Sequence, residues 1–102
     1  MLNKDKCFKA ILKEFTQELN SFENLKVDPH SIYSVIIEPL LSRVCDKYWA
    51  DEHILYSISL IRLSFDKRTR DIGFEICLHV KEIFEPRFKA YRISITFQNK
   101  VN

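Results

Sequence analysis

A chain of 102 residues has the usual size of one domain and can bury roughly 65% of its unfolded surface in a single core. Hydrophobic residues make up 46% and charged residues 29%, which predicts one packed domain over residues 1–102 and excludes a disordered chain. The net charge of +2 gives no polyelectrolyte signal, and no apolar run approaches the ~18 residues that span a bilayer, so we expect no membrane partner.

Three cysteines, Cys7, Cys45 and Cys77, lie far apart in the chain among apolar neighbours. Their odd number and wide spacing do not predict a disulfide framework. We expect them to be small hydrophobic side chains in a reducing compartment, which predicts a cytoplasmic protein.

From Phe8 to Phe22, apolar residues recur at spacings of three and four, with lysines and glutamates between them. This period predicts an amphipathic helix with one buried face. Asn3 is the candidate for the residue that caps its start.

A second helix is predicted to start at Asp28-Pro29, because aspartate is a favoured N-cap and proline is tolerated at the first helical position. The apolar residues that follow keep helical spacing through Pro39. That proline has no N–H to donate to the carbonyl of Val35, and its ring pushes against the same carbonyl. We therefore expect a kink or a break near Glu38.

Beyond Trp49 the apolar period changes to two, which is typical of strands. The first predicted strand, His53–Phe65, holds one phase up to Leu60 and the opposite phase from Ile61 onward. A β-bulge at these two residues would return both halves to one face of the sheet. Since bulges help to protect edge strands, we expect this strand to lie at an edge.

The remaining strands, Ile72–Val80 and Tyr91–Phe97, alternate apolar and polar residues. A turn centred on Arg68-Thr69 joins the first strand to the second. The expected pairs across it are Phe65 with Ile72, Leu63 with Phe74, Ile61 with Ile76 and Arg62 with Glu75. A tight turn over Glu85–Phe88 joins the second strand to the third. The expected pairs there are Val80 with Ile93, Leu78 with Ile95 and Ile76 with Phe97.

These elements predict an α+β fold. Two N-terminal helices, the second kinked or broken near Pro39, pack on one face of a three-stranded antiparallel β-meander. The strand order is first, second, third, with the second strand in the centre.

The residues give little support for a ligand site. Gly73 is the only glycine, so the glycine-rich loops that hold nucleotide phosphates are excluded, and its place inside a strand indicates a close approach or a local twist. Cys77 and His79 share one strand face, but two ligands are too few for a metal unless Cys45 or His30 joins them. We expect no metal and no cofactor.

Nucleophilic catalysis is also disfavoured. In the predicted register, His79 faces Ser94 and Cys77 faces Thr96 on an open sheet face, which seldom provides the concave pocket that a nucleophile needs. We therefore expect a protein without enzymatic activity. A small enzyme built on Cys77 and His79 is the third hypothesis.

Basic residues gather at both predicted turns. Arg68 and Arg70 lie with Lys67 at the first turn, between Asp66 and Asp71. The second cluster is Lys81, Arg87, Lys89 and Arg92, at the opposite end of the sheet. Because the two clusters do not form one stripe, a nucleic-acid-binding accessory role is the alternative hypothesis.

Two aromatic residues favour recognition of another protein. Trp49 lies between the second helix and the first strand, where it could also close the open end of the core, and Phe88 lies in the outward phase beside Arg92. By elimination we expect a stoichiometric binder, such as an inhibitor, an immunity protein or an antitoxin. A homodimer through an edge strand stays open. The candidate partner-binding residues are Trp49, Arg68, Arg70, Phe88 and Arg92.

Overall fold

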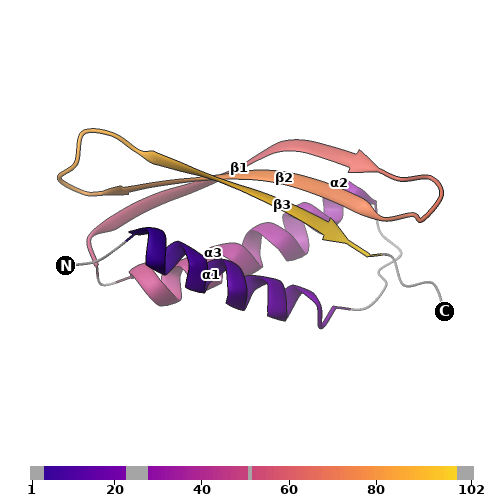
Figure 1. Cartoon of the computed structure of the whole chain (residues 1–102), viewed down its shortest axis with the longest axis horizontal. Helices are drawn as coiled ribbons and strands as arrows, with labels where there is room; N and C mark the ends of the chain where they lie inside the picture. The colour runs from indigo at the N-terminus through magenta and orange to yellow at the C-terminus, as the bar shows by residue number, and fades with distance from the viewer. Residues whose placement is uncertain (1–3, 23–27, 51, 99–102) are drawn as a thin grey trace.

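Two helices form one layer under one face of a three-stranded sheet (Figure 1). The computed structural model describes residues 4–22, 28–50 and 52–98. The strands pair antiparallel in the order β1-β2-β3, which confirms the predicted α+β meander. The elements are α1 (Lys4–Leu19), α2 (Pro29–Ile32), the π-helical turn η1 (Tyr33–Ile37), α3 (Glu38–Trp49), β1 (Ile54–Phe65), β2 (Ile72–Glu82) and β3 (Lys89–Phe97).

The first helix, α1, buries one stripe of side chains against the rest of the fold. Ile11, Phe15 and Leu19 follow one another at intervals of four residues, and all three are buried. The helix ends at Leu19, so Phe22 lies beyond it and is exposed. The predicted cap, Asn3, lies outside the described residues.

The second helix starts as its sequence predicts. The Asp28 carboxylate accepts hydrogen bonds from the backbone N–H of Ser31 at 3.1 Å and from its hydroxyl at 2.6 Å. Pro29 occupies the first helical position. Because both Ser31 donors favour the charged carboxylate, they hold the pKa of Asp28 below its usual range.

The irregularity expected near Glu38 takes the form of a π-helical turn. α2, η1 and α3 follow one another without a gap, and the N–H of Glu38 donates to the carbonyl of Tyr33, five residues back. A π-helical turn inserts one extra residue into the helix. The helix therefore accommodates Pro39 directly after this wider turn and continues to Trp49.

The first hairpin has the predicted turn and the predicted bulge, with a register shift between Leu60 and Arg62. The placement of Ile61 is wrong: Leu60 lies opposite Ile76, and Ile61 is the extra residue, with 45% of its side chain exposed. Alternation locates a bulge to two residues, but the ladder hydrogen bonds decide which of them is unpaired. The confirmed pairs are Phe65 with Ile72, Leu63 with Phe74 and Arg62 with Glu75.

The single glycine marks a close approach between two strands, as its position predicts. Gly73 pairs with Ser64, and a Cβ added at Gly73 would lie 2.5 Å from the Ser64 hydroxyl oxygen. A larger side chain there would require the serine side chain to move.

The predicted register of the second hairpin is wrong by four residues, because Val80 pairs with Lys89 instead of Ile93. β2 ends at Glu82 and β3 begins at Lys89, so a loop over residues 83–88 replaces the tight turn. An even slip keeps apolar residues opposite apolar residues, so alternation does not distinguish the two registers. The observed pairs include Leu78 with Tyr91, Ile76 with Ile93, Phe74 with Ile95 and Ile72 with Phe97.

The core is deepest under the central strand. All five core-facing residues of β2 are buried: Ile72, Phe74, Ile76, Leu78 and Val80. The core-facing residues of β1 are only partly buried: Ile54, Tyr56, Ile58, Leu60 and Leu63. The molecule is elongated, 47 × 23 × 19 Å, and its two hairpin turns lie at opposite ends (Figure 1).

Candidate interaction surfaces

Exposed apolar side chains gather at the end of the sheet where β2 joins β3. We call this group the Phe84 tip. It consists of Leu55 (44% exposed), Ile83 (44%), Phe84 (93%) and Phe88 (50%).

Backbone and side-chain contacts bring Leu55, Ile83 and Phe88 to the same end of the sheet, and Phe84 directly follows Ile83 in the chain. Leu55 pairs with Lys81 across the first two strands, and the Lys81 ammonium lies 5.3 Å from the centre of the Phe88 ring. The N–H of Ile83 donates to the carbonyl of His53 at 2.8 Å, which extends the pairing beyond the end of β2. The tip therefore spans the width of the sheet, with a cation among its apolar groups.

The loop that carries Phe84 is fastened to the start of α1. Lys4 forms an ion pair with Glu85 at 2.6 Å, and Asp5 accepts hydrogen bonds from Lys89 and from the Tyr91 hydroxyl, both at 2.6 Å. The bond from Lys89, and then that from Tyr91, lowers the pKa of Asp5, while the Lys4 ammonium lowers the pKa of Glu85. At neutral pH both carboxylates are charged, and both contacts hold the loop against the helix.

Phe88 is the one sequence-predicted residue that belongs to this tip. Phe84, Ile83 and Leu55 were missed. The signal for two of them is in the sequence: Ile83 and Phe84 are adjacent apolar residues that interrupt the alternation of β2 just before Pro86. Neighbouring apolar residues after a strand that alternates cannot both face the core.

Trp49 does not offer a surface to a partner. Its side chain is 1% exposed, its ring centre lies 6.1 Å from that of Tyr56, and its indole N–H has no hydrogen-bond acceptor among the described residues. The Tyr56 hydroxyl donates to Asp46 of α3, and burial, with that carboxylate, raises the pKa of Tyr56 to about 12. Trp49 and Tyr56 therefore join α3 to β1 as part of the core.

The two arginines of the first turn are exposed, but an acidic residue organises the backbone beneath them. The Asp66 carboxylate accepts hydrogen bonds from the N–H of Arg68 at 2.8 Å and of Thr69 at 3.3 Å. Arg70 has a positive φ of 63°. Asp66 thus has a structural role in the turn, and Arg68 and Arg70 lie at the opposite end of the long axis from the Phe84 tip (Figure 1).

Cys77 and His79 lie on the open face of the sheet, with the sulfur 3.5 Å from the imidazole Nε2. Their predicted neighbours are wrong because of the register of the second hairpin. Cys77 lies opposite Arg92, which is exposed on the same face, and His79 lies opposite Ala90. In the described parts of the chain, no group of three or more His, Cys, Asp or Glu side chains could hold a metal ion.

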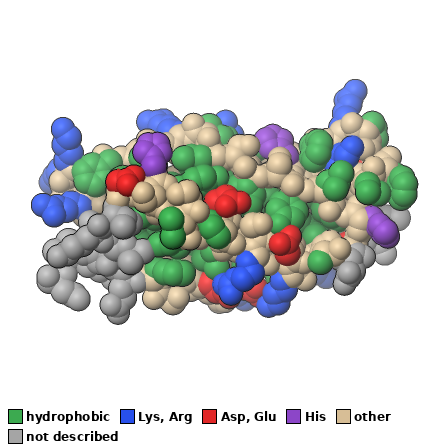
Figure 2. All heavy atoms as spheres, turned by 180° about the vertical axis from the view of Figure 1, so that it is seen from behind, with side chains coloured by type: hydrophobic (Ala, Val, Ile, Leu, Met, Phe, Trp, Pro, Cys, Tyr) green, Lys and Arg blue, Asp and Glu red, His purple; other side chains and the backbone are tan. Residues whose placement is uncertain are grey.

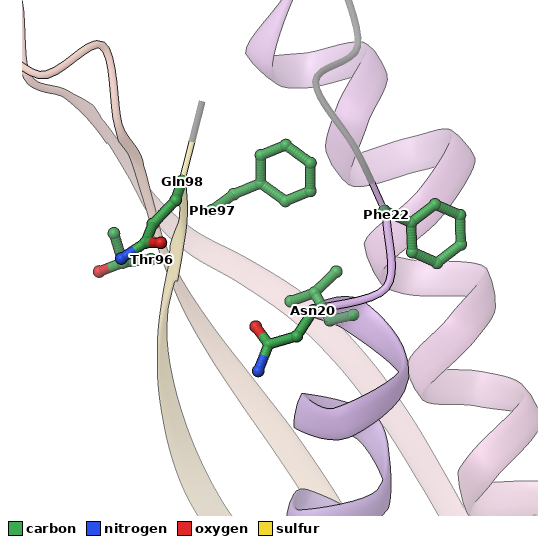
Figure 3. Close-up of a pocket in the computed structure, with 6 residues that line it drawn as sticks. Asn20, Phe22, Thr96, Phe97 and Gln98 are labelled. Atoms are coloured by element: carbon green, nitrogen blue, oxygen red, sulfur yellow. The ribbon is translucent and has the colours of Figure 1, made fainter. Parts of the chain in front are cut away.

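Two hollows lie away from these residues. One of about 400 Å³ opens between the end of α1 and the end of β3 (Figure 3); it is lined by Leu19, Asn20, Phe22, Thr96, Phe97 and Gln98. A second hollow, of about 210 Å³, lies over Gly73 on the sheet, where Arg62 and Glu75 are its charged groups.

Comparison of the chain with models of known protein families, with curated proteins and with solved structures finds no match. No helix in the described ranges has both the length and the apolar character to cross a membrane. All three cysteines are free.

Proposed function

We propose that the chain is a cytoplasmic, non-enzymatic protein that binds another protein stoichiometrically, as an inhibitor, an immunity protein or an antitoxin does. The observation that carries the proposal is Phe84, which is 93% exposed beside three other exposed apolar side chains. Contiguous apolar surface on a monomer is typical of an interaction site, and aromatic residues are enriched where proteins meet.

The fold gives no reason for apolar residues in this loop. Turns are usually built from Gly, Pro, Asn, Asp and Ser, which satisfy the backbone or set its angles. The side chains of Ile83 and Phe84 do neither, and Phe84 is 93% exposed. A function outside the fold explains why they stand there.

The tip is also suited to binding because it is held in place before a partner arrives. The backbone hydrogen bond from Ile83 to His53 holds the loop before Phe84, and the Lys4–Glu85 and Asp5–Lys89 ion pairs hold it after Phe84. A loop that is already ordered loses less conformational entropy on binding, so more of the contact energy appears as affinity.

The alternative function is binding to nucleic acid, and the charge of the open sheet face favours it. Strand alternation puts Arg62, Lys81 and Arg92 on that face against Glu75. Phosphate contacts need such cations. We prefer a protein partner because, among the described residues, this face has no exposed aromatic side chain on which a base could stack other than Phe88 at its end.

Affinity capture with the immobilised full chain tests the proposal. The Phe84→Ser variant should lose the partner that the unchanged chain retains from a lysate of the cells that produce it. Val35→Ser is the matched control, because Val35 is 71% exposed on η1, away from the sheet. A partner retained equally by Phe84→Ser, or lost equally by both variants, contradicts the tip as the binding site.

A further inference from the structure

The free edge of β1 lacks the charges that usually protect an edge strand. The run Ile54–Leu60 contains no charged residue and no proline, and the first charge of the strand is Arg62, beyond the bulge. The other edge strand, β3, carries Lys89 and Arg92 within nine residues. Unprotected edges are templates for pairing with another strand.

The side chains along this edge are also incompletely covered. The core-facing residues of β1 from Ile54 to Leu63 are only partly buried and Phe65 is exposed, whereas every core-facing residue of β2 is buried. Figure 2, the view from behind Figure 1, shows hydrophobic side chains along much of the length of the molecule. A strand beside β1 would cover this row.

The backbone of β1 is oriented to accept such a strand. His53 accepts a hydrogen bond from Ile83, so the ladder to β2 uses His53 and the alternate residues that follow it. In an antiparallel ladder the residues between them direct their N–H and C=O groups away from the partner strand. Those residues are Ile54, Tyr56, Ile58 and Leu60, and no strand in the described part of the chain lies on the side of β1 away from β2.

We propose that β1 pairs antiparallel with β1 of a second copy of this chain, with Ser57 on the two-fold axis. Two-fold dimers are the commonest assemblies of identical chains. In this register every core-facing residue meets another, and the four outward backbone pairs exchange about eight hydrogen bonds. The pairs are Ile54 with Leu60, Leu55 with Ser59, Tyr56 with Ile58, and Ser57 with Ser57.

The proposed register also matches the length of the regular part of β1. The bulge at Leu60 and Ile61 ends the regular part of β1, and the proposed pairing uses the whole regular part and nothing beyond it. The outward positions at its centre are serines, so no like charges meet across the axis. Of the Phe84 tip, the pairing includes Leu55 and none of Ile83, Phe84 and Phe88.

A charge placed on the two-fold axis tests the dimer. Ser57→Lys puts two ammonium groups directly opposite each other and should weaken association at least ~10-fold. Ser94→Lys is the matched control, because Ser94 is equally an exposed, outward serine on the other edge strand, opposite Glu75. Sedimentation equilibrium of the full chain at about 100 μM and about 1 μM measures the mass, since mass action governs a dimer.

Hydrogen exchange locates the interface. The amides of Tyr56, Ile58 and Leu60 should exchange slowly in the dimer and rapidly in Ser57→Lys and on dilution. A dimeric wild type and Ser94→Lys, with a monomeric Ser57→Lys, support the proposal. A monomeric wild type at the higher concentration overturns it, as does equal dissociation of both variants or a dimer in which those three amides exchange rapidly.

Discussion

Alanine substitutions of Ile76 and of Ile61, made singly, distinguish the observed register of β1 from one in which Ile61 faces the core. Ile76 is 0% exposed on the central strand, whereas Ile61 is the bulged residue and is 45% exposed. Ile→Ala removes about three methyl or methylene groups, worth ~0.8 kcal/mol each when buried, and leaves a cavity. Ile76→Ala should therefore lower the free energy of unfolding by about 4 kcal/mol, and Ile61→Ala by about 1 kcal/mol, because it leaves no cavity.

Thermal and urea unfolding followed by circular dichroism measure this difference. For a domain of this size, about 3 kcal/mol corresponds to a difference of at least ~12 °C in Tm between the two variants. If Ile61 instead faced the core opposite Ile76, Ile61→Ala would remove partly buried groups and should cost ~2 kcal/mol or more. A loss of that size would refute the placement of Ile61 as the exposed, bulged residue and of Leu60 in the core.

Three further outcomes follow from the structure. Asp28→Ala should lower Tm at pH 7. The difference in Tm from the wild type should shrink as the pH falls through the lowered pKa of Asp28, which lies below the ordinary value of about 4, because the folded wild type then loses its charged cap. A difference in Tm that stays unchanged at acid pH contradicts the cap. Random duplex or single-stranded nucleic acid should bind negligibly at about 150 mM salt. Micromolar binding that falls at least ~10-fold between about 50 and 200 mM salt and is abolished by Arg68→Ala with Arg70→Ala would favour the alternative function. Cys77→Ala and His79→Ala should leave partner affinity within a few fold, whereas loss of a catalytic or metal-binding group commonly costs ~100-fold.

The fold could be predicted because several local patterns agree. The cap at Asp28, the helical period of α1 and the phase slip at Leu60 each restrict one element, and the structure has all three. Each of these signals depends on near neighbours in the chain. Their agreement is what specifies helices on one face of a meander.

The second hairpin shows where local patterns fail. Two registers that differ by an even number of residues bury the same side chains, so the alternation of β2 and β3 fits both. The observed one pairs Val80 with Lys89 and leaves residues 83–88 as a loop. The two ion pairs and the tyrosine hydrogen bond that join Lys4 and Asp5 to this hairpin connect residues that are 81 to 86 positions apart, and no local pattern reports them.

The candidate site was predicted only in part for a related reason. Phe88 is predicted because it is an aromatic residue in the outward phase of a strand, while Trp49 is predicted from its residue type and its place between the second helix and the first strand. Residue type does not report burial, and Trp49 packs on Tyr56 inside the fold. Phe84 becomes a candidate once the loop that carries it is known to leave it exposed.

The most direct test of the proposed function is the affinity of a captured partner for the wild type and for Phe84→Ser. Titration calorimetry gives the stoichiometry and the dissociation constant, and unfolding curves check that the variant is as stable as the wild type. Loss of an exposed aromatic anchor should raise Kd at least ~10-fold, with one partner bound per chain in the wild type and Val35→Ser unchanged. A Kd within about threefold of the wild type for a stable Phe84→Ser would contradict the proposal, because hot-spot residues cost far more than that when truncated.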